Sequence, residues 1–374
     1  MARVCLVGFG RVGSLTAQLL VELGHTVVAY DSSSSRREEA ESLGIEYHLA
    51  SAINERLAAR LASECDAIAT ALPSRAAEQA LPLLLSKSPS VVVDVSYVRD
   101  PLSYRELAEE RGVRLYVDAG VAPGLSNVLA ARAAREAGRA SEVTVYVGGI
   151  SADPSAPLGL VASWSMADLL EEYTRKARAR VNGSPAELDP IYDATRVEIP
   201  GLGAFDAMPT DGLRTLLESL RDVPTLVEYT LRYPGHVEII RQLHELGLLS
   251  DHPYVVEGAS MSPRALFSKI LEEKLPRTGD RLVMYVEARG RRGSGSVEVG
   301  YLLDATQEGL GLSAPVLSYA TALMHAWTVD RALRAGGEAG VYPPERFEPH
   351  AEELVEFYRR KGIQILKRVC ETSH

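Results

Sequence analysis

The sequence predicts an α/β fold in which a Rossmann-type, doubly wound parallel sheet precedes a second α+β domain with a mixed or antiparallel sheet. Two observations predict the first part. A strand, a glycine turn and a helix follow one another within the first 24 residues, and extended and helical segments then alternate to about residue 119, as in parallel βαβ units. The second part is predicted from residue 142 onward, where strands outnumber crossover helices.

The glycine turn is the first candidate site. The apolar run RVCLV at residues 3–7 has the character of a buried strand, and GFGRVG follows it directly. Gly8 permits a tight turn, Gly10 lets the backbone approach a phosphate, and Gly13 lets the helix pack against the strand. The amides at the helix N-terminus favour an anion, so we expect a dinucleotide pyrophosphate there. The expected pyrophosphate-binding residues are Gly8, Gly10, Arg11, Val12 and Gly13.

The second strand bears on the choice of cofactor. HTVVAY at residues 25–30 leads to Asp31, whose carboxylate can accept both hydroxyls of an adenosine ribose, or can simply cap the strand. The run that follows, which starts at Ser32 and continues to Arg36 and a second arginine, suits a 2′-phosphate that Asp31 would repel. We therefore expect NAD, with NADP as the alternative.

Four more strands complete the expected first domain, at residues 45–49, 66–72, 90–96 and 113–119. Ligands of open parallel sheets lie beyond the carboxyl ends of the strands, so the nicotinamide half of the cofactor is expected at the ends of these strands. The residues predicted there are Leu72, Pro73, Val95, Ser96, Asp118 and Gly120.

The second domain is expected to begin after the stretch DAGVAPGLSN at residues 118–127. Its predicted strands are EVTVYVGGI, TRVEI, GAFDAM and a hairpin at 281–304 with GRRGSG as its turn. Amphipathic helices are predicted around 165–173, 210–222, 235–248 and 263–274. The predicted domains are 1–124 for the dinucleotide, 125–312 for substrate and dimerisation, and 313–374 as a segment that returns to the first domain.

Composition and charge narrow the function classes. A net charge of −10 disfavours nucleic acid and anionic membranes as partners, and no run of eighteen apolar residues occurs. With the first strand starting at residue 3, we expect no signal peptide and a cytoplasmic protein. Cys5, Cys65 and Cys370 match no metal or disulfide spacing, so we expect reduced thiols, with Cys5 as a small buried apolar residue, and no metal site.

Short clusters in the second half mix charge with turn residues, namely GGI (148–150), EEYTRKAR (171–178), PTDGLRT (209–215) and LRYPGH (231–236). Singly, each also fits a solvated helix end or a capped helix start. Together with GFGRVG, ALP (71–73), VDVS (93–96) and DAGVAPGLSN, they make the chain resemble the saccharopine dehydrogenase-like family, and within it the lysine 6-dehydrogenases most closely. Lys176, where the relatives have proline, and the DSSSSRR run depart from that pattern.

The resemblance implies NAD-linked oxidation at a carbon that bears nitrogen. We expect oxidative deamination of the ε-amino group of L-lysine to a semialdehyde, which cyclises to piperideine-6-carboxylate, in a homodimer. One alternative is a saccharopine or carboxyspermidine-type reductase, which acts on a secondary amine between two amino-acid-like pieces and needs more carboxylate clamps. A second alternative is a non-catalytic dinucleotide-binding sensor.

Candidate residues for this chemistry come from the motif clusters. Asp118 is a candidate base or amine anchor, or alternatively a turn cap. His236 is a candidate acid–base that titrates near neutrality, or alternatively a partner of the helix-start backbone. Any of three arginines could clamp the substrate carboxylate, and an acid could hold its α-ammonium group, in a cleft between the domains. The predicted substrate-binding residues are Glu172, Tyr173, Arg175, Asp211, Arg214 and Arg232.

Overall fold

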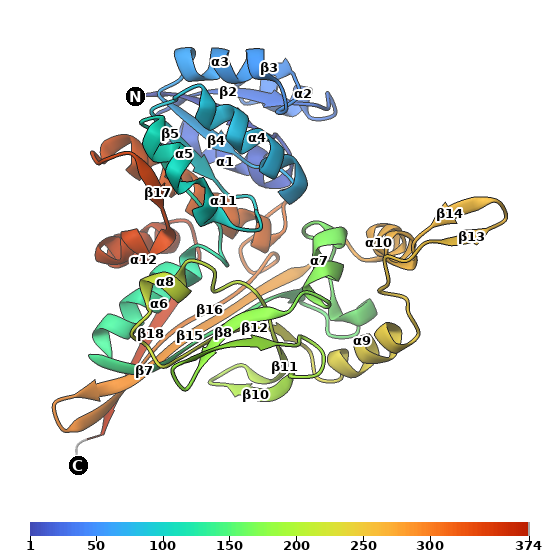
Figure 1. Ribbon diagram of the computed structural model, residues 1–374, viewed down its shortest axis with the longest axis vertical. Coiled ribbons are helices and arrows are strands. Elements are labelled where there is room, and N and C mark those ends of the chain that lie inside the picture. Colours follow the sequence, from blue (N-terminus) through green and yellow to red (C-terminus); the bar gives the residue numbers. More distant parts are fainter. Residues whose placement is uncertain (373–374) are drawn as a thin grey trace. The chain divides into compact units, whose positions relative to one another are not determined.

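The computed structural model describes residues 1–372, which form two compact units (Figure 1). Unit 1 comprises residues 1–128 and 318–354, and unit 2 comprises residues 129–317 and the chain from 355 onward. The sequence analysis places the whole of 313–374 with the first domain. The structure instead groups the end of the chain with unit 2, because its last strand, β18 (Ile365–Thr372), pairs antiparallel with β16 (Gly295–Thr306).

Unit 1 is the predicted Rossmann-type domain. Its seven strands are parallel, in the order β17-β6-β5-β4-β1-β2-β3. The strands are β1 (Arg3–Val7), β2 (Thr26–Asp31), β3 (Glu46–Leu49), β4 (Ala67–Thr70), β5 (Val91–Asp94), β6 (Arg114–Tyr116) and β17 (Gly340–Tyr342). The helices within it are α1 (Arg11–Glu22), α2 (Arg37–Ser42), α3 (Glu55–Glu64), α4 (Ser74–Ser86), η1 (Pro101–Tyr104), α5 (Arg105–Glu110) and η3 (Pro344–His350). The boundary between the units falls within α6 (Leu125–Glu136), α11 (Val316–Arg334) and α12 (Ala351–Arg360).

The core of unit 1 explains why its strands could be predicted. Successive residues of β1, which point to opposite faces of the sheet, are all buried from Val4 to Val7, so both faces are covered. The six expected strands are all present. β17 was not expected, because it is a three-residue strand between a glycine pair and a proline pair, where the sequence indicates a break.

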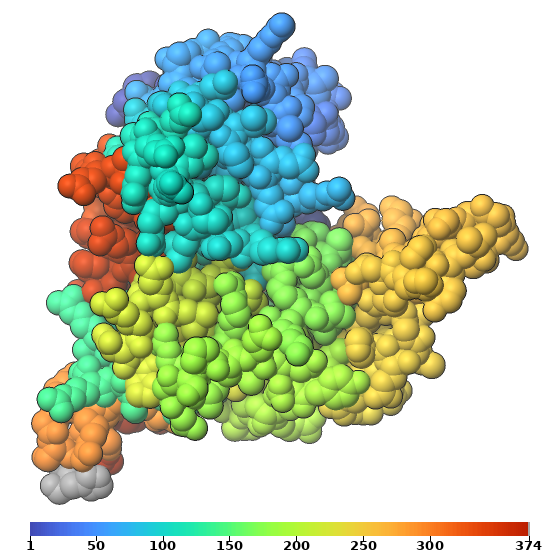
Figure 2. Space-filling model, viewed as in Figure 1, coloured from blue at the N-terminus to red at the C-terminus, as the bar shows by residue number. Residues whose placement is uncertain are grey.

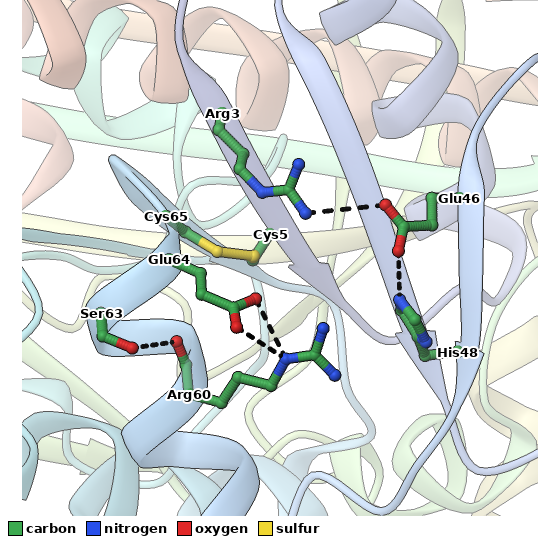
Figure 3. A network of polar contacts seen from close by, with 8 residues as sticks. All are labelled: Arg3, Cys5, Glu46, His48, Arg60, Ser63, Glu64 and Cys65. Atoms are coloured by element: carbon green, nitrogen blue, oxygen red, sulfur yellow. Dashed lines mark hydrogen bonds and ion pairs between the residues drawn. A yellow bond between two sulfur atoms is a disulfide. The ribbon is translucent and has the colours of Figure 1, made fainter.

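The expectation of reduced thiols is wrong for two of the three cysteines. Cys5 on β1 and Cys65 at the end of α3 form a disulfide with their Cα atoms 5.9 Å apart, beside Arg60 and Glu64 of α3 (Figure 3). The reason is the strand order: β1 pairs with β4, so the end of the helix that leads into β4 lies next to Cys5. Cys370 remains a free, exposed thiol.

Unit 2 is built on a nine-stranded mixed sheet, in the order β10-β11-β12-β7-β15-β16-β18, with β8 joined to β12 and β9 to β8. Its remaining strands are β7 (Arg139–Ser151), β8 (Ala177–Val181), β9 (Ser184–Leu188), β10 (Thr195–Ile199), β11 (Gly203–Pro209), β12 (Thr225–Arg232) and β15 (Asp280–Arg292), and a separate hairpin is formed by β13 (Tyr254–Val256) and β14 (Ala259–Met261). The helices are η2 (Pro157–Gly159), α7 (Met166–Glu172), α8 (Leu216–Ser219), α9 (His236–Glu245) and α10 (Pro263–Lys274).

The α+β class predicted for this half of the chain is confirmed, and so is the long hairpin, whose two strands close at the Arg292–Gly295 pair. The predicted helix at 210–222 is wrong, because only α8 is helical there. Arg214 has a left-handed φ of 47°, which ends any helix that would start at Thr210. None of the helices within residues 1–372 has the length and hydropathy of a membrane span.

Candidate active site

The glycine turn of unit 1 leaves open space where a pyrophosphate would lie. A Cβ atom on Gly8 would lie 2.3 Å from the Ala71 carbonyl oxygen, and one on Gly13 would lie 2.0 Å from the Gly8 carbonyl oxygen, so these two glycines allow close backbone packing. Around the Cβ position of Gly10, in contrast, no atom of the described residues other than those of Gly10 and its neighbours in the chain lies within 4 Å. The turn is therefore tight at two glycines and open at the third.

The helix that starts at this opening is suited to an anion. Gly10 is the N-cap of α1, and no side chain within residues 1–372 caps the helix. The first turn, which includes Arg11, contains no acidic residue. The amides at the start of α1 therefore lie beside the open space without a competing carboxylate, and this arrangement fits a dinucleotide pyrophosphate.

Asp31 fixes the loop that would hold the adenosine ribose. It ends β2, and its Oδ2 accepts a hydrogen bond from the Phe9 amide at 2.6 Å while Oδ1 accepts one from the Ser33 amide at 2.8 Å. The carboxylate thus joins the glycine turn to the serine run that includes Ser32. Arg36, the cation expected to favour a 2′-phosphate, donates to the hydroxyl of Ser14 at 3.1 Å and to the carboxylate of Glu39 at 2.8 Å.

The carboxyl ends of β4, β5 and β6 carry the other residues predicted for the cofactor. Ser96 connects the ends of β4 and β5, because its hydroxyl accepts a hydrogen bond from the Leu72 amide at 3.2 Å and donates one to the Asp94 carboxylate at 2.8 Å. Asp94, at the end of β5, is fully buried, and burial raises its pKa to about 6 although hydrogen bonds from Thr70 and Ser96 lower it. Asp118 is also buried, with a left-handed φ of 53°. Pro73, Val95 and Gly120 adjoin these residues in the chain.

In unit 2, His236 forms hydrogen bonds through both ring nitrogens. Its Nδ1 lies 3.0 Å from the Leu158 carbonyl oxygen, which can only accept, so Nδ1 carries the proton and Nε2 accepts from the Tyr173 hydroxyl at 3.0 Å. Burial, and secondarily the charge of Arg232, lower the pKa of His236 to about 3. The ring is therefore neutral at physiological pH, and the expected titration near neutrality is corrected for this reason.

Arg232 links this pair to an acid. Its guanidinium group lies 3.4 Å from a carboxylate oxygen of Glu172 at the end of α7. Burial of the carboxyl group raises the pKa of Glu172 to about 7, while the charge of Arg232 acts in the opposite direction and that of Asp168 in the same direction. Glu172 thus titrates in the range that the sequence analysis assigned to His236.

A second acid, Glu228 of β12, was missed from the sequence. Its side chain is buried, and burial together with the neighbouring acids Glu172 and Asp211 raises its pKa well above the usual range. Its Oε2 has no hydrogen-bond partner among the described residues. A Cβ atom on Gly212 would lie 1.7 Å from this oxygen, so the glycine of TDGLR makes room for the carboxyl group. Its strand, TLVEYTLR, mixes apolar and polar residues, so nothing in the sequence marks this glutamate as a site residue.

The other predicted substrate residues surround these acids. Asp211 forms a two-point ion pair with Arg178, at 2.8 and 3.0 Å. Arg214 is buried, and its charge lowers the pKa of Glu228. Arg175, at the edge of the cluster, pairs with Glu171 one helical turn earlier. The acid cluster of unit 2 is defined here as Glu172, Asp211 and Glu228 with their arginines.

A separate cavity of about 290 Å³ lies between the end of β10 and the strands β7, β15 and β16. Its lining includes Tyr146, Tyr285 and Glu287. None of the predicted site residues lines it.

Comparisons with known proteins place the chain in a family. The family model for the saccharopine dehydrogenase C-terminal domain matches residues 120–363, and the TrkA-N domain model matches residues 4–116. The chain belongs to the saccharopine dehydrogenase family. This confirms the family resemblance, while the lysine 6-dehydrogenase assignment within it stays a prediction.

Curated relatives in the saccharopine dehydrogenase family support this placement over part of their length. The NADP⁺-dependent, L-glutamate-forming saccharopine dehydrogenase of Saccharomyces cerevisiae is 30% identical over 176 residues, which cover 43% of this chain and 39% of that protein. The Schizosaccharomyces pombe enzyme of the same name is 28% identical over 173 residues, covering 43% and 38%. The match thus spans about two fifths of the relatives.

The solved structure of the apo S. cerevisiae enzyme shares the fold of the whole chain. Its TM-score is 0.80 at 17% identity, over 99% of this chain and all of the yeast one. The saccharopine dehydrogenase fold, with a parallel Rossmann-type sheet and a second mixed sheet, is therefore shown for this protein.

Proposed function

We propose that the protein is an NAD(P)-dependent oxidoreductase that oxidises the ε-amino group of L-lysine to the semialdehyde, which cyclises to piperideine-6-carboxylate. The observation that carries the proposal is a pair of neighbouring carboxyl groups with raised pKa, the buried Glu228 and the partly exposed Glu172, of which Glu228 has an oxygen without a partner in residues 1–372. An ammonium group beside them would supply the missing donor and stabilise their ionised forms.

The arginines support a substrate with one carboxylate rather than several. Arg175 faces Glu171, Arg178 faces Asp211 and Arg232 faces Glu172. Saccharopine has three carboxylates. To bind them, the site would need more arginines than it has acids already paired with arginines. Lysine has one carboxylate and two ammonium groups, so it needs fewer arginine clamps than saccharopine and offers hydrogen-bond donors to Glu172 and Glu228.

The residues of the chain would act mainly on protons and orientation. A lysine ammonium has a reference pKa near 10.4, so its proton must be removed before hydride leaves the adjacent carbon. Glu172, with a pKa of about 7, is suited to take that proton, and Asp118 in unit 1 stays a second candidate base or anchor. The neutral His236 would hold the hydroxyl of Tyr173 in place as a positioning residue.

The glycine turn and Asp31 would hold the dinucleotide. When bound, its nicotinamide supplies the hydride acceptor, and water attack on the resulting imine would release ammonia. We propose NAD as the preferred form, since the Asp31 carboxylate disfavours a 2′-phosphate and Arg36 is already engaged by Ser14 and Glu39.

The test is a screen of NAD and NADP against lysine, ornithine, saccharopine and diaminopimelate, followed by the absorbance of the reduced dinucleotide and by release of ammonia. We expect lysine to reduce the dinucleotide, with one ammonia released for each hydride transferred. Reduction with saccharopine alone, without ammonia, would favour the second candidate, a secondary-amine dehydrogenase, which the curated relatives suggest by name. Dinucleotide binding with no reduction for any substrate would favour a sensor.

A further inference from the structure

The cavity of about 290 Å³ in unit 2 forms where the sheet curls over itself. β10 is an edge strand of that sheet, yet its Ile199 belongs to the same core cluster as Tyr285 of β15. The end of β10, which lies on the surface of unit 2 and is light green in Figures 1 and 2, forms one wall of the cavity. The volume is close to the lower end of the range for small-molecule sites, roughly 300 Å³.

Two tyrosines stand side by side at this cavity. Tyr146 and Tyr285 are direct neighbours across β7 and β15, and their rings are 13° from parallel with centroids 6.3 Å apart. Both line the cavity. Within residues 1–372, neither hydroxyl group takes part in a hydrogen bond. The cavity wall therefore contains two phenol oxygens that are available to a ligand.

Tyr285 is the buried member of this pair, with 3% of its surface exposed. Its ring lies over Gly300 of β16, where a Cβ atom would be 2.9 Å from the hydroxyl oxygen. Gly300 is the direct partner of Glu287, so the hydroxyl lies near that acid. Burial raises the pKa of Tyr285 to about 12, and the charges of Glu287 and Glu298 act in the same direction. A buried polar side chain without a hydrogen bond costs free energy, which a bound ligand would recover.

The charges around the cavity favour a cation. Its described lining contains the acids Glu198, Glu287 and Glu298 but a single base, Arg289. That arginine is already engaged, because its guanidinium group lies 2.7 Å from Glu287 and 3.4 Å from Glu298. It also lies 3.6 Å from Glu142, which is not part of the lining. With more carboxyl groups than its one engaged arginine can balance, the cavity attracts positive charge and repels anions.

Glu287 is the acid best placed to hold such a cation. It is 9% exposed, and burial raises its pKa, while Arg289 acts in the opposite direction and Glu298 in the same one. A cation next to Glu287 would stabilise its ionised form. A primary ammonium group has three N–H donors, and the Glu287 carboxylate with the hydroxyls of Tyr146 and Tyr285 provides three acceptors for them.

The wall formed by β10 suits the carbon chain of an organic cation. Three apolar residues from this part of the chain line the cavity, namely Val197, Ile199 and Pro200. They would contact the alkyl group that carries the ammonium nitrogen, and a metal ion has no such group. The lining thus combines acceptors for the charged end of the ligand with apolar surface for the rest.

We propose that this cavity is a second ligand site of unit 2, which binds a small primary alkylammonium ion between Glu287 and the hydroxyls of Tyr146 and Tyr285. None of the residues of the acid cluster lines it. The proposal therefore does not rest on the proposed function, and it concerns a site other than that of the proposed substrate.

The test is calorimetric titration of the full chain with butylammonium at fixed ionic strength, in a Glu172→Gln variant so that the acid cluster contributes less. Butylammonium is expected to bind, and Glu287→Gln is expected to weaken binding by about tenfold or more, because it removes a charged acceptor. The matched control is Glu142→Gln, which removes the same charge and another neighbour of Arg289 but lies outside the lining. It should change the affinity by less than about twofold.

Two further measurements test the tyrosines and the donors. Tyr285→Phe keeps the ring and the net charge but removes the hydroxyl, and should weaken binding by about threefold or more. Tetramethylammonium has no N–H donor and should bind more weakly than butylammonium.

The proposal is overturned by any of four results: absence of binding, equal weakening in Glu287→Gln and Glu142→Gln, an unchanged affinity in Tyr285→Phe, or equal affinities for the two ammonium ions. Circular dichroism and dinucleotide affinity establish that the variants remain folded. Lack of lysine oxidation together with normal butylammonium binding would contradict the proposed function alone.

Discussion

Removal of the disulfide between Cys5 and Cys65 is expected to lower the free energy of unfolding by about 4 kcal/mol. The two cysteines are 60 residues apart. A cross-link over a loop of this length removes about 14 cal/mol/K of entropy from the unfolded chain, which corresponds to about 4 kcal/mol at 25 °C. The Cys5→Ala/Cys65→Ala variant should therefore unfold at a lower denaturant concentration, while the backbone pairing of β1 with β4 is retained.

The measurement is equilibrium unfolding in denaturant without reductant, with a Cys370→Ala variant as the control. Cys370 is exposed and free, so its replacement should not move the unfolding midpoint. Thiol titration of the unreduced, denatured wild type should find one reactive thiol. Three reactive thiols, or a double variant as stable as the control, would refute the reasoning.

Three further predictions concern the site. A Gly10→Val variant should remain folded but bind the dinucleotide at least about tenfold more weakly in calorimetry, because the valine side chain would occupy the space for the pyrophosphate. The control is Gly336→Val, at an equally open position, which should keep full affinity. Asp31→Ser should shift the ratio of NAD to NADP affinity toward NADP by about 1–2 kcal/mol, as charge repulsion is removed; an unchanged ratio would mean that another residue reads the ribose. The pH profile of kcat/KM should rise through about pH 7, because only the ionised carboxylate of Glu172 accepts a proton. This limb should disappear in Glu172→Gln but remain in His236→Asn, which should lower turnover; the opposite pattern would return the acid–base role to the histidine.

The Rossmann half was predictable because its signals are local. Most of its strands are short apolar runs, and Gly8, Gly24 and Gly112 mark turns between elements, so the elements could be read one at a time. The disulfide could not be read in this way, since the meeting of Cys5 with Cys65 depends on β1 lying next to β4 rather than on any spacing in the sequence. β17 joins the same sheet from the far end of the chain, for a similarly non-local reason.

In unit 2, the motifs located the residues but not their partners. The clusters EEYTRKAR, PTDGLRT and LRYPGH supplied Glu172, Asp211 and Arg232, which the structure links through charge. The sequence offered no means to rank the arginines, because ranking depends on which carboxylate each one faces. Arg178, which was not considered, engages Asp211, and Glu228 was overlooked because a strand residue without a motif gives no sign of being a site residue.

Burial also explains why the titration range of His236 was predicted wrongly. A low-dielectric environment disfavours charge, so it moves the pKa of a histidine down and that of a carboxyl group up. The sequence analysis used reference values, by which His236 titrates near neutrality and glutamates do not. Within the buried cluster the two shifts act in opposite directions: the pKa of His236 falls to about 3, with Arg232 contributing to the fall, and that of Glu172 rises to about 7. The same desolvation that keeps the histidine neutral thus brings a carboxyl group into the range where it can exchange a proton with a substrate amine.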